Sequence, residues 1–526
     1  MIVRTLAPET VKPALTAIDE IAFVDVREYG QYGEGHPFFS VNLPYSRLEL
    51  RAAYLLPRRD CSIILFDEND GVAQKAATRL SELGYTNLAI MEGGAPAWAA
   101  AGFTLFKGVN VPSKAFGEAV EQTCKTPRIT AQELNARLDR KDKLVLLDGR
   151  TLAEFRKMNV PGARACPNGE LGLRIGDFTP DDTTLIVINC AGRTRSIIGA
   201  QTLAHLGVAN PILALENGTQ GWELAGYDLQ VGADPGELPE VERGAINQHR
   251  QRAETLRTRF AVPAITLETL KTWQVDKTRS LYLLDVRTHG EYEAGYFPGS
   301  LHAPGGQLVQ TTDHWIAVRG ARIVLLDDSG IRASTTAMWL RQMGHDAVVL
   351  DRNVAELAAL ESGPDAGPPC PETLPLCPAA DLAGKISNGA ALLDLGPSQT
   401  YRKEHIEGAN WAVRPRLADL DLQPGQDIIL LSAERAAAEL AALDLRELGI
   451  HSLSLNQDGA DAWRAAGLSI TATPDRPADD LCIDHLYFVH ERHIGNLEAA
   501  RQYLAWEINL LNQMDDQESS VYTIIN

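Results

Sequence analysis

The stretch LIVINCAGRTRSIIGAQTLAHLG, residues 185–207, decides the fold of this chain. Its first residues form a continuous apolar run, which is typical of a parallel strand that is buried on both faces. Cys190 closes this segment, and after a short polar loop a helical pattern runs to Gly207, the expected end of a helix. The stretch therefore predicts a strand, a loop and a helix, with a thiol at the carboxyl end of the strand.

The same unit occurs four times along the chain. In the other three copies an oxygen-bearing side chain stands in place of the thiol, at Asp67, Asp327 and Ser432. Each helical pattern again ends at a glycine, and an earlier apolar run ends in an aspartate in every copy: Asp25, Asp148, Asp285 and Asp394. Repeats of this size indicate one structural unit used several times.

Strands that alternate with helices predict a parallel sheet with helices on both faces. We therefore predict an α/β protein of four tandem domains, each with a mostly parallel sheet flanked by helices, and a C-terminal helical tail. The predicted domains span residues 1–110, 125–235, 260–362 and 373–472, and the tail spans 473–526. Within the tail we expect one amphipathic helix.

Composition excludes several classes of function. The 526 residues carry a formal net charge of -20, which argues against a nucleic-acid or anionic-membrane partner. No apolar run is long enough to span a membrane, and the N-terminus lacks the pattern of a signal peptide. The seven scattered cysteines do not suggest a disulfide framework. We expect a cytoplasmic protein with no metal ion and no cofactor.

The surroundings of Cys190 favour a reactive thiolate. Backbone N–H groups at the start of the following helix, together with Arg193 and Arg195, would stabilise a negative charge on the sulfur. Such surroundings lower the pKa of a cysteine below its usual value of about 8.5. The alternative is an inert cysteine that only packs, but the loop residues beside Cys190 are small or polar. The other cysteines are predicted to pack in the core, with the role of Cys166 left open.

The motifs around Cys190 resemble those of the rhodanese family of sulfurtransferases. The segment CAGRTRS, 190–196, resembles that family's active-site loop. LLDGRTLAEF (146–155) and VPGAR (160–164) resemble its upstream motifs, and ENGTQGW (216–222) resembles its downstream element. The resemblance implies a tandem four-domain member with one active domain. It also implies transfer of a sulfane sulfur from thiosulfate, a mercaptoacid such as 3-mercaptopyruvate, or a persulfide to a thiol or cyanide.

The resemblance also assigns roles to residues. Cys190 becomes the nucleophile that carries the sulfur as a persulfide, and Arg193 binds the anionic group of the donor. The loop that binds the sulfur consists of Ala191, Gly192, Arg193, Thr194, Arg195 and Ser196. Asp148, Arg150 and Glu154 support the first turn, with Glu154 as the expected partner of Arg150. Arg164 and Arg174 precede the catalytic strand and are expected to face the pocket.

Two alternatives remain open. A cysteine-dependent phosphatase is disfavoured because four residues separate Cys190 from Arg195, and the related phosphatases have five, as a phosphate needs a larger loop. A non-catalytic scaffold or sulfur carrier would dock a protein partner, or a second copy, through the inactive domains or the C-terminal helix. For a sulfurtransferase, we expect the first domain to form a wall of the pocket of the second, with the third domain as the alternative.

Overall fold

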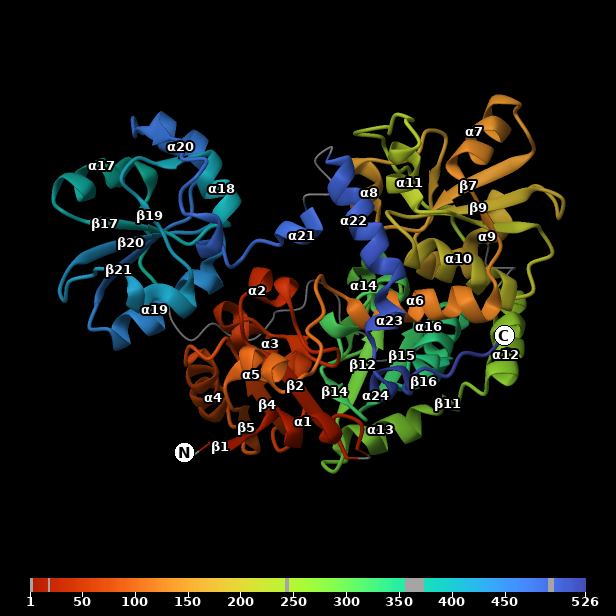
Figure 1. Cartoon of the computed structure of the whole chain (residues 1–526), viewed down its shortest axis with the longest axis horizontal. Helices are drawn as coiled ribbons and strands as arrows, with labels where there is room; N and C mark the ends of the chain where they lie inside the picture. The colour runs from red at the N-terminus through yellow and green to blue at the C-terminus, as the bar shows by residue number, and fades with distance from the viewer. Residues whose placement is uncertain (1–2, 18, 242–245, 355–372, 491–495) are drawn as a thin grey trace. The chain divides into compact units, whose positions relative to one another are not determined.

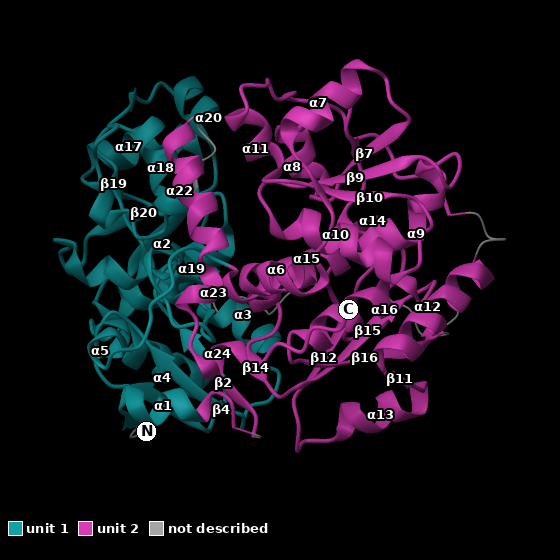
Figure 2. Cartoon of the chain, turned by 45° about the vertical axis from the view of Figure 1, so that its right-hand side comes forward, with its two compact units in different colours: residues 1–13, 22–109, 365–489 teal, residues 14–21, 110–364, 490–526 magenta. Residues whose placement is uncertain are grey.

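The computed structural model describes the chain except for residues 1–2, 18, 242–245, 355–372 and 491–495 (Figure 1). The chain divides into two compact units (Figure 2). Unit 1 comprises residues 1–13, 22–109 and 365–489, and unit 2 comprises residues 14–21, 110–364 and 490–526. The sheets of the first and fourth predicted domains belong to unit 1, and those of the second and third belong to unit 2.

The second domain contains a parallel five-stranded sheet in the order β6-β10-β9-β7-β8. The strands are β6 (Arg128–Ile129), β7 (Leu144–Asp148), β8 (Arg164–Ala165), β9 (Leu185–Asn189) and β10 (Ile212–Leu215). The helices are α6 (Val111–Cys124), α7 (Ala131–Asp139), α8 (Leu152–Lys157), α9 (Asn168–Phe178), α10 (Thr194–His205) and α11 (Gly218–Leu224).

Alternate residues of β9 enter two different apolar clusters, one on each face of the sheet. Ile186 and Ile188 pack with α9 and α10, whereas Leu185 and Val187 pack with the cluster that contains Trp222. All five residues of the strand are buried. This explains the apolar run from Leu185 to Ile188, because a strand covered by helices on both sides has no face exposed to water.

The third domain repeats this strand order as β11-β16-β15-β12-β13. Its strands are β11 (Ala264–Ile265), β12 (Leu281–Asp285), β13 (Leu301–His302), β15 (Arg322–Asp327) and β16 (Asp346–Asn353). Its helices are α12 (Ile246–Phe260), α13 (Leu267–Val275), α14 (His289–Ala294), α15 (Gly305–Gln310) and α16 (Ile331–Gln342).

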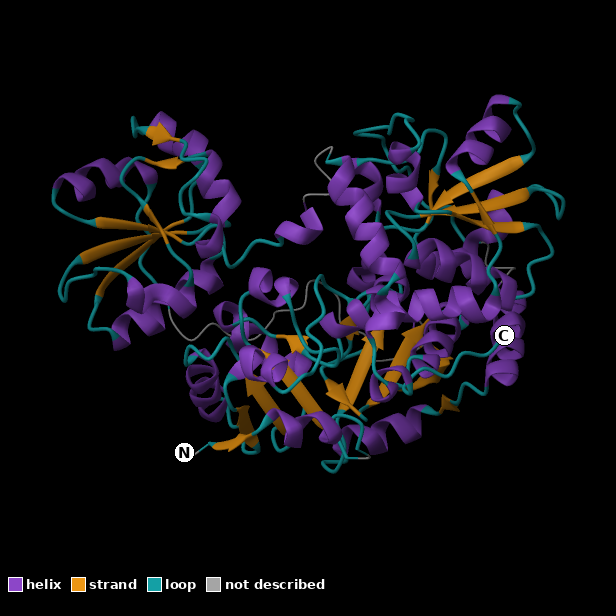
Figure 3. Cartoon of the chain, viewed as in Figure 1, coloured by secondary structure: helices purple, strands orange, loops and turns teal. Residues whose placement is uncertain are grey.

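Unit 1 contains two further sheets of the same kind. In the first domain, β1 (Arg4–Leu6), β5 (Leu88–Met91), β4 (Ser62–Phe66) and β2 (Ile21–Asp25) are neighbours, and β3 (Val41–Asn42) pairs with β2. In the fourth, the order is β19 (Asn410–Trp411), β17 (Ala391–Asp394), β20 (Asp427–Leu431) and β21 (Ser452–Asn456). Figure 3 shows the strands of each sheet lying between helices. The predicted α/β class is therefore confirmed, while the domain boundaries stay a prediction.

The second and third domains pack together inside unit 2. Helix α9 lies against α15 and α16. Between the two domains, the indole of Trp339 on α16 donates to the hydroxyl of Thr202 on α10 at 2.8 Å, and Arg332 on α16 pairs with Glu170 on α9 at 3.1 Å. The third domain is thus the neighbour of the second within this unit.

The C-terminal tail differs from the single amphipathic helix that we expected. Its described part forms a 3-10 helix at Asp479–Leu481 and four α-helices: α21 (Tyr487–His490), α22 (Leu497–Ile508), α23 (Leu510–Gln513) and α24 (Asp516–Ser519). Asn496 caps the start of α22 by accepting a hydrogen bond from the backbone of Ala499, which helps to fix where that helix begins. Among the described residues, no helix combines the length and the apolar character that crossing a bilayer requires.

Candidate active site

Cys190 lies directly after β9, in the loop that leads into α10, and only 2% of it is exposed. The start of α11 holds this loop in place. The backbone N–H of Thr219 donates to the carbonyl of Cys190 at 2.8 Å, and that of Gln220 donates to the carbonyl of Ala191 at 3.1 Å. Gly218 has a φ of +55°, and a Cβ there would lie 2.3 Å from the Cys190 carbonyl oxygen. Glycine is therefore required at this close approach.

The sulfur of Cys190 is in contact with the first turn of α10. The thiol donates to the hydroxyl oxygen of Ser196 at 3.5 Å, and the Ser196 hydroxyl in turn donates to the carbonyl of Arg193 at 2.8 Å. Burial raises the pKa of Cys190, while Arg195 and the hydroxyl and backbone N–H of Ser196 lower it. Burial outweighs these groups, so the pKa is raised and not lowered as we expected from the sequence.

Arg195 forms a two-pronged ion pair with Glu154 of α8, at 2.8 and 2.7 Å. We expected Glu154 to pair with Arg150, but the capping box that it forms with Thr151 directs it to the active-site loop. Burial would raise the pKa of Glu154, yet the charge and hydrogen bonds of Arg195, with those of Thr151, lower it to about 2. The pair ties α8 to the start of α10.

Asp148 and Arg150 form a buried pair at the end of β7. Arg150 donates to the two Asp148 oxygens at 2.9 and 2.7 Å, and to the carbonyl of Met158 at 2.6 Å. Asn189, the last residue of β9, also donates to Asp148 at 2.9 Å. The pair thus joins the carboxyl ends of two neighbouring strands beneath the Cys190 loop.

Arg193 connects the loop to α6. Its guanidinium donates to the two oxygens of Glu118 at 2.6 and 2.9 Å and also pairs with Glu121. Burial raises the pKa of Glu118 to about 7, although Arg193 acts to lower it. An anionic donor would therefore have to compete with two carboxylates for Arg193.

The structure does not bring Arg164 and Arg174 to Cys190 through any described contact. The guanidinium of Arg164 lies 4.4 Å from the centre of the Phe178 ring. Arg174 donates to Glu170 at 2.8 Å and to the carbonyl of Pro239. Cys166 is fully buried in the core, and burial raises its pKa.

A carboxylate from the tail contacts the loop that follows Cys190. Glu507 of α22 is 3% exposed and accepts a hydrogen bond from the Thr194 hydroxyl at 2.8 Å. The sequence contains no signal for this contact, because 313 residues separate the two partners. Glu118 was missed for a similar reason, since it lies on a helix that precedes the second sheet.

The corresponding loop of the third domain stabilises a negative charge on one of its own side chains. Asp327 stands where Cys190 stands in the second domain, and its carboxylate accepts backbone hydrogen bonds from Asp328, Ser329, Arg332 and Ala333 at 2.7–3.3 Å. Arg332 donates to it at 3.0 Å and also pairs with Glu291, just as Arg195 pairs with Glu154. These bonds outweigh burial and hold the pKa of Asp327 well below its usual range.

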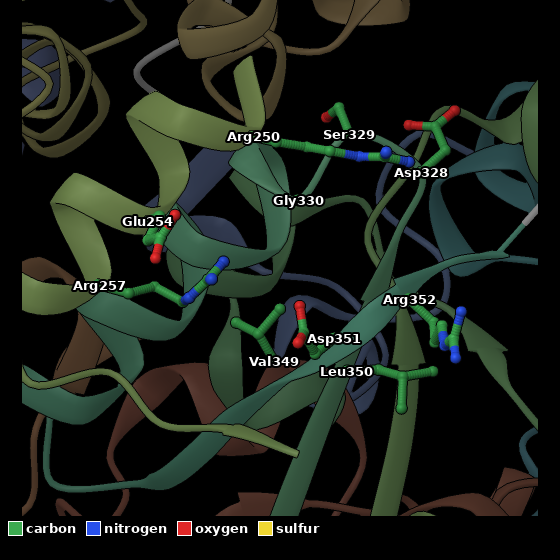
Figure 4. Close-up of a pocket in the computed structure, with 10 residues that line it drawn as sticks. All are labelled: Arg250, Glu254, Arg257, Asp328, Ser329, Gly330, Val349, Leu350, Asp351 and Arg352. Carbon is green, nitrogen blue, oxygen red and sulfur yellow. The ribbon is translucent and has the colours of Figure 1, made fainter. Parts of the chain in front are cut away.

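A cavity of about 260 Å³ lies beside this third loop (Figure 4). It is lined by residues of α12, of the loop and of β16, among them Arg250, Glu254 and Gly330. Gly330 follows Asp327 by the spacing that separates Arg193 from Cys190. Arg193 reaches α6, whereas Gly330 has no side chain to fill the corresponding space next to α12. The two loops thus differ at two positions: a thiol against a carboxylate after the central strand, and an arginine against a glycine three residues later.

Comparisons with known proteins agree with the repeated fold. The family model of the Rhodanese-like domain matches residues 8–101, 130–225 and 266–359. The crystal structure of a thiosulfate sulfurtransferase from Pseudomonas aeruginosa is 39% identical and has a TM-score of 0.91, with 100% of both chains covered. The putative sulfur carrier protein YrkF of Bacillus subtilis (strain 168) is 32% identical over 89 residues, which are 17% of this chain and 46% of that protein. The chain thus spans about half of that curated relative.

Proposed function

The chain belongs to the rhodanese family, and on this premise we propose that it is a sulfurtransferase that carries a sulfane sulfur on Cys190. The proposed donor is thiosulfate, a mercaptoacid such as 3-mercaptopyruvate, or a persulfide, and the proposed acceptor is a thiol or cyanide. The solved thiosulfate sulfurtransferase, with its full coverage, supports the reaction class. The compartment we propose is the cytoplasm.

The reaction proceeds in two half-reactions. In the first, the Cys190 thiolate attacks the outer sulfur of the donor, so that a new S–S bond forms at Sγ. The donor's own bond to that sulfur breaks, and its electron pair leaves with the remaining fragment, which is sulfite when the donor is thiosulfate. In the second, the acceptor attacks the outer sulfur of the persulfide, and the electron pair of the S–S bond returns to Cys190 as thiolate.

The main support for this proposal is the way in which the loop after β15, in the third domain, binds the carboxylate of its own Asp327. A loop of the same length and arginine position binds the Asp327 carboxylate through several backbone N–H groups. In the second domain, a persulfide on Cys190 extends the side chain by one anionic sulfur, and the N–H of Ser196 and the charge of Arg195 stabilise it. Asp67, Asp327 and Ser432 cannot form such a persulfide, so we assign catalysis to the second domain alone.

Mass spectrometry of the Cys190 peptide tests the proposal. Treatment with thiosulfate, 3-mercaptopyruvate or a hydropersulfide is expected to add one sulfur atom to Cys190, and cyanide or a thiol is expected to remove it. Cys190→Ser abolishes turnover, whereas Cys166→Ser, which changes a core cysteine, retains it. Turnover by Cys190→Ser would refute the proposal. A persulfide that forms without turnover would support the sulfur-carrier alternative, in which the inactive domains or the tail dock a protein partner.

A further inference from the structure

The tail places a buried carboxylate close to Gly192, the second residue after Cys190. A Cβ on Gly192 would lie 3.1 Å from Oε2 of Glu507 and 3.7 Å from Nε2 of Gln220. Leu504, one turn earlier on α22, would lie 3.8 Å from the same point. Two polar groups and one apolar group from α11 and α22 therefore lie close to the backbone of Gly192, two residues after Cys190.

Both polar side chains have hydrogen-bonding capacity to spare. Gln220 is 3% exposed, and within the described part of the chain neither its amide nitrogen nor its amide oxygen has a hydrogen-bond partner. Buried amides normally have partners, so an unsatisfied one beside a reactive group points to a ligand. Glu507 accepts one hydrogen bond from the neutral hydroxyl of Thr194. A buried carboxylate gains most from a cation.

The cations of the loop already have partners. Arg193 pairs with Glu118 and Glu121, and Arg195 pairs with Glu154. Lys114 of α6 lies over the rings of Tyr503 and Trp506, at 5.4 and 5.1 Å from their centres. Among the described residues Glu507 thus has no ion pair of its own, although its charge acts on Arg193, whose pKa it helps to raise. Glu507 is also among the groups that act to raise the pKa of Cys190.

We propose that Glu507, with Gln220 beside it, selects the sulfur donor by its charge. The favoured donor carries an ammonium group, as the hydropersulfide of an aminothiol does, and a dianion such as thiosulfate is disfavoured. The ammonium group pairs with Glu507, while Gln220 exchanges hydrogen bonds with the polar groups of the same molecule. This inference rests on the proposed function, because it ranks donors for the same reaction.

The transfer from such a donor balances without another reactant. The Cys190 thiolate attacks the terminal sulfur of R–S–SH, and a bond forms between Sγ and that sulfur. The S–S bond of the donor breaks, and its electron pair leaves on R–S⁻. One disulfide-type bond thus replaces another, and the transferred sulfur then releases its proton to water, which leaves the anionic persulfide on Cys190.

Alkylation of Cys190 by two reagents of similar size tests the charge effect without any sulfur transfer. Iodoacetamide is neutral and iodoacetate is anionic, and mass spectrometry of the Cys190 peptide measures both rates in the full-length protein. Glu507→Gln keeps the size and the acceptor for Thr194. It is expected to raise the iodoacetate rate about tenfold relative to the iodoacetamide rate, as removal of one nearby charge implies. Glu498→Gln, at an exposed position of the same helix, is the control and leaves the ratio unchanged.

The donors provide the second measurement. Glu507→Gln is expected to shift the ratio of kcat/KM for thiosulfate over cysteamine hydropersulfide about tenfold toward thiosulfate. The inference is overturned when Glu507→Gln gives the alkylation ratio of the wild type, or when neither reagent reaches Cys190 in the native protein. A changed alkylation ratio in a protein that turns over no donor would instead refute the proposed function and leave the charge effect standing.

Discussion

Replacement of Arg193 by methionine leaves the Glu118 carboxylate buried without its cation. Glu118 is 3% exposed and Arg193 is 5% exposed. Removing one partner of a buried ion pair destabilises a protein by about 3–5 kcal/mol, because the remaining charge stays out of water. We therefore expect Arg193→Met to lower the free energy of unfolding by about 3 kcal/mol at pH 8.

The loss of stability in Arg193→Met should be larger at high pH than at low pH. In the folded protein the pKa of Glu118 is about 7, above its ordinary value of 4.5. Its contribution to stability is thus fully present below pH 4.5 and declines as the pH rises to 7, because the folded state binds the proton more tightly. Without Arg193 the pKa of Glu118 rises further, so the stability of the variant falls more steeply as the pH rises. At pH 5 the deficit should shrink to about 1 kcal/mol, the value of the lost hydrogen bonds.

Calorimetry at the two pH values measures these deficits. In a compact unit as large as unit 2, each kcal/mol lost from the free energy of unfolding lowers the Tm by about 2–4 °C. Arg193→Met should therefore lower the Tm by about 6–12 °C at pH 8. Adding Glu118→Gln should restore most of the loss. Arg128→Met is the matched control, since Arg128 is 53% exposed and also pairs with Glu121. Equal deficits at both pH values, or no recovery in the double variant, would refute the reasoning.

Three further predictions concern the same domain. Gly218→Ala is expected to reduce the rate of sulfur transfer about tenfold or more, because the added Cβ displaces the Cys190 carbonyl. Gly226→Ala is the control and should keep the wild-type rate, since Gly226 has a φ of +86° and open space around it. Equal rates for the two variants in steady-state assays would contradict this. Glu154→Gln should lower the free energy of unfolding by about 1 kcal/mol at pH 7, after solvent screening is taken into account. This difference from the wild type, measured by urea unfolding, should shrink as the pH drops from 4.5 toward 2, because the wild-type carboxylate then protonates. Iodoacetamide at pH 8 should label Cys166 only after denaturation, since burial raises its pKa; labelling in the native protein, seen by mass spectrometry, would count against its core position.

The repeated architecture was predictable from local patterns. Continuous apolar runs, helical periodicity and glycine helix ends are properties of short segments, so strands such as β9 and helices such as α10 follow from the residues within them. The position of Cys190 after β9 followed as well, because a parallel strand ends where its apolar run ends. The tail was harder to predict, since its helical pattern does not show where a long segment breaks into shorter helices.

The sequence by itself therefore determined four α/β repeats and the one copy with a thiol at the end of its central strand. Only the tertiary structure decided which charges meet there. Arg195 pairs with Glu154, Arg193 pairs with Glu118, and Thr194 meets Glu507 across 41, 75 and 313 residues. Such partners depend on the path of the whole chain and not on local spacing. The raised pKa of Cys190 has the same origin, because desolvation depends on what the folded protein packs around the sulfur.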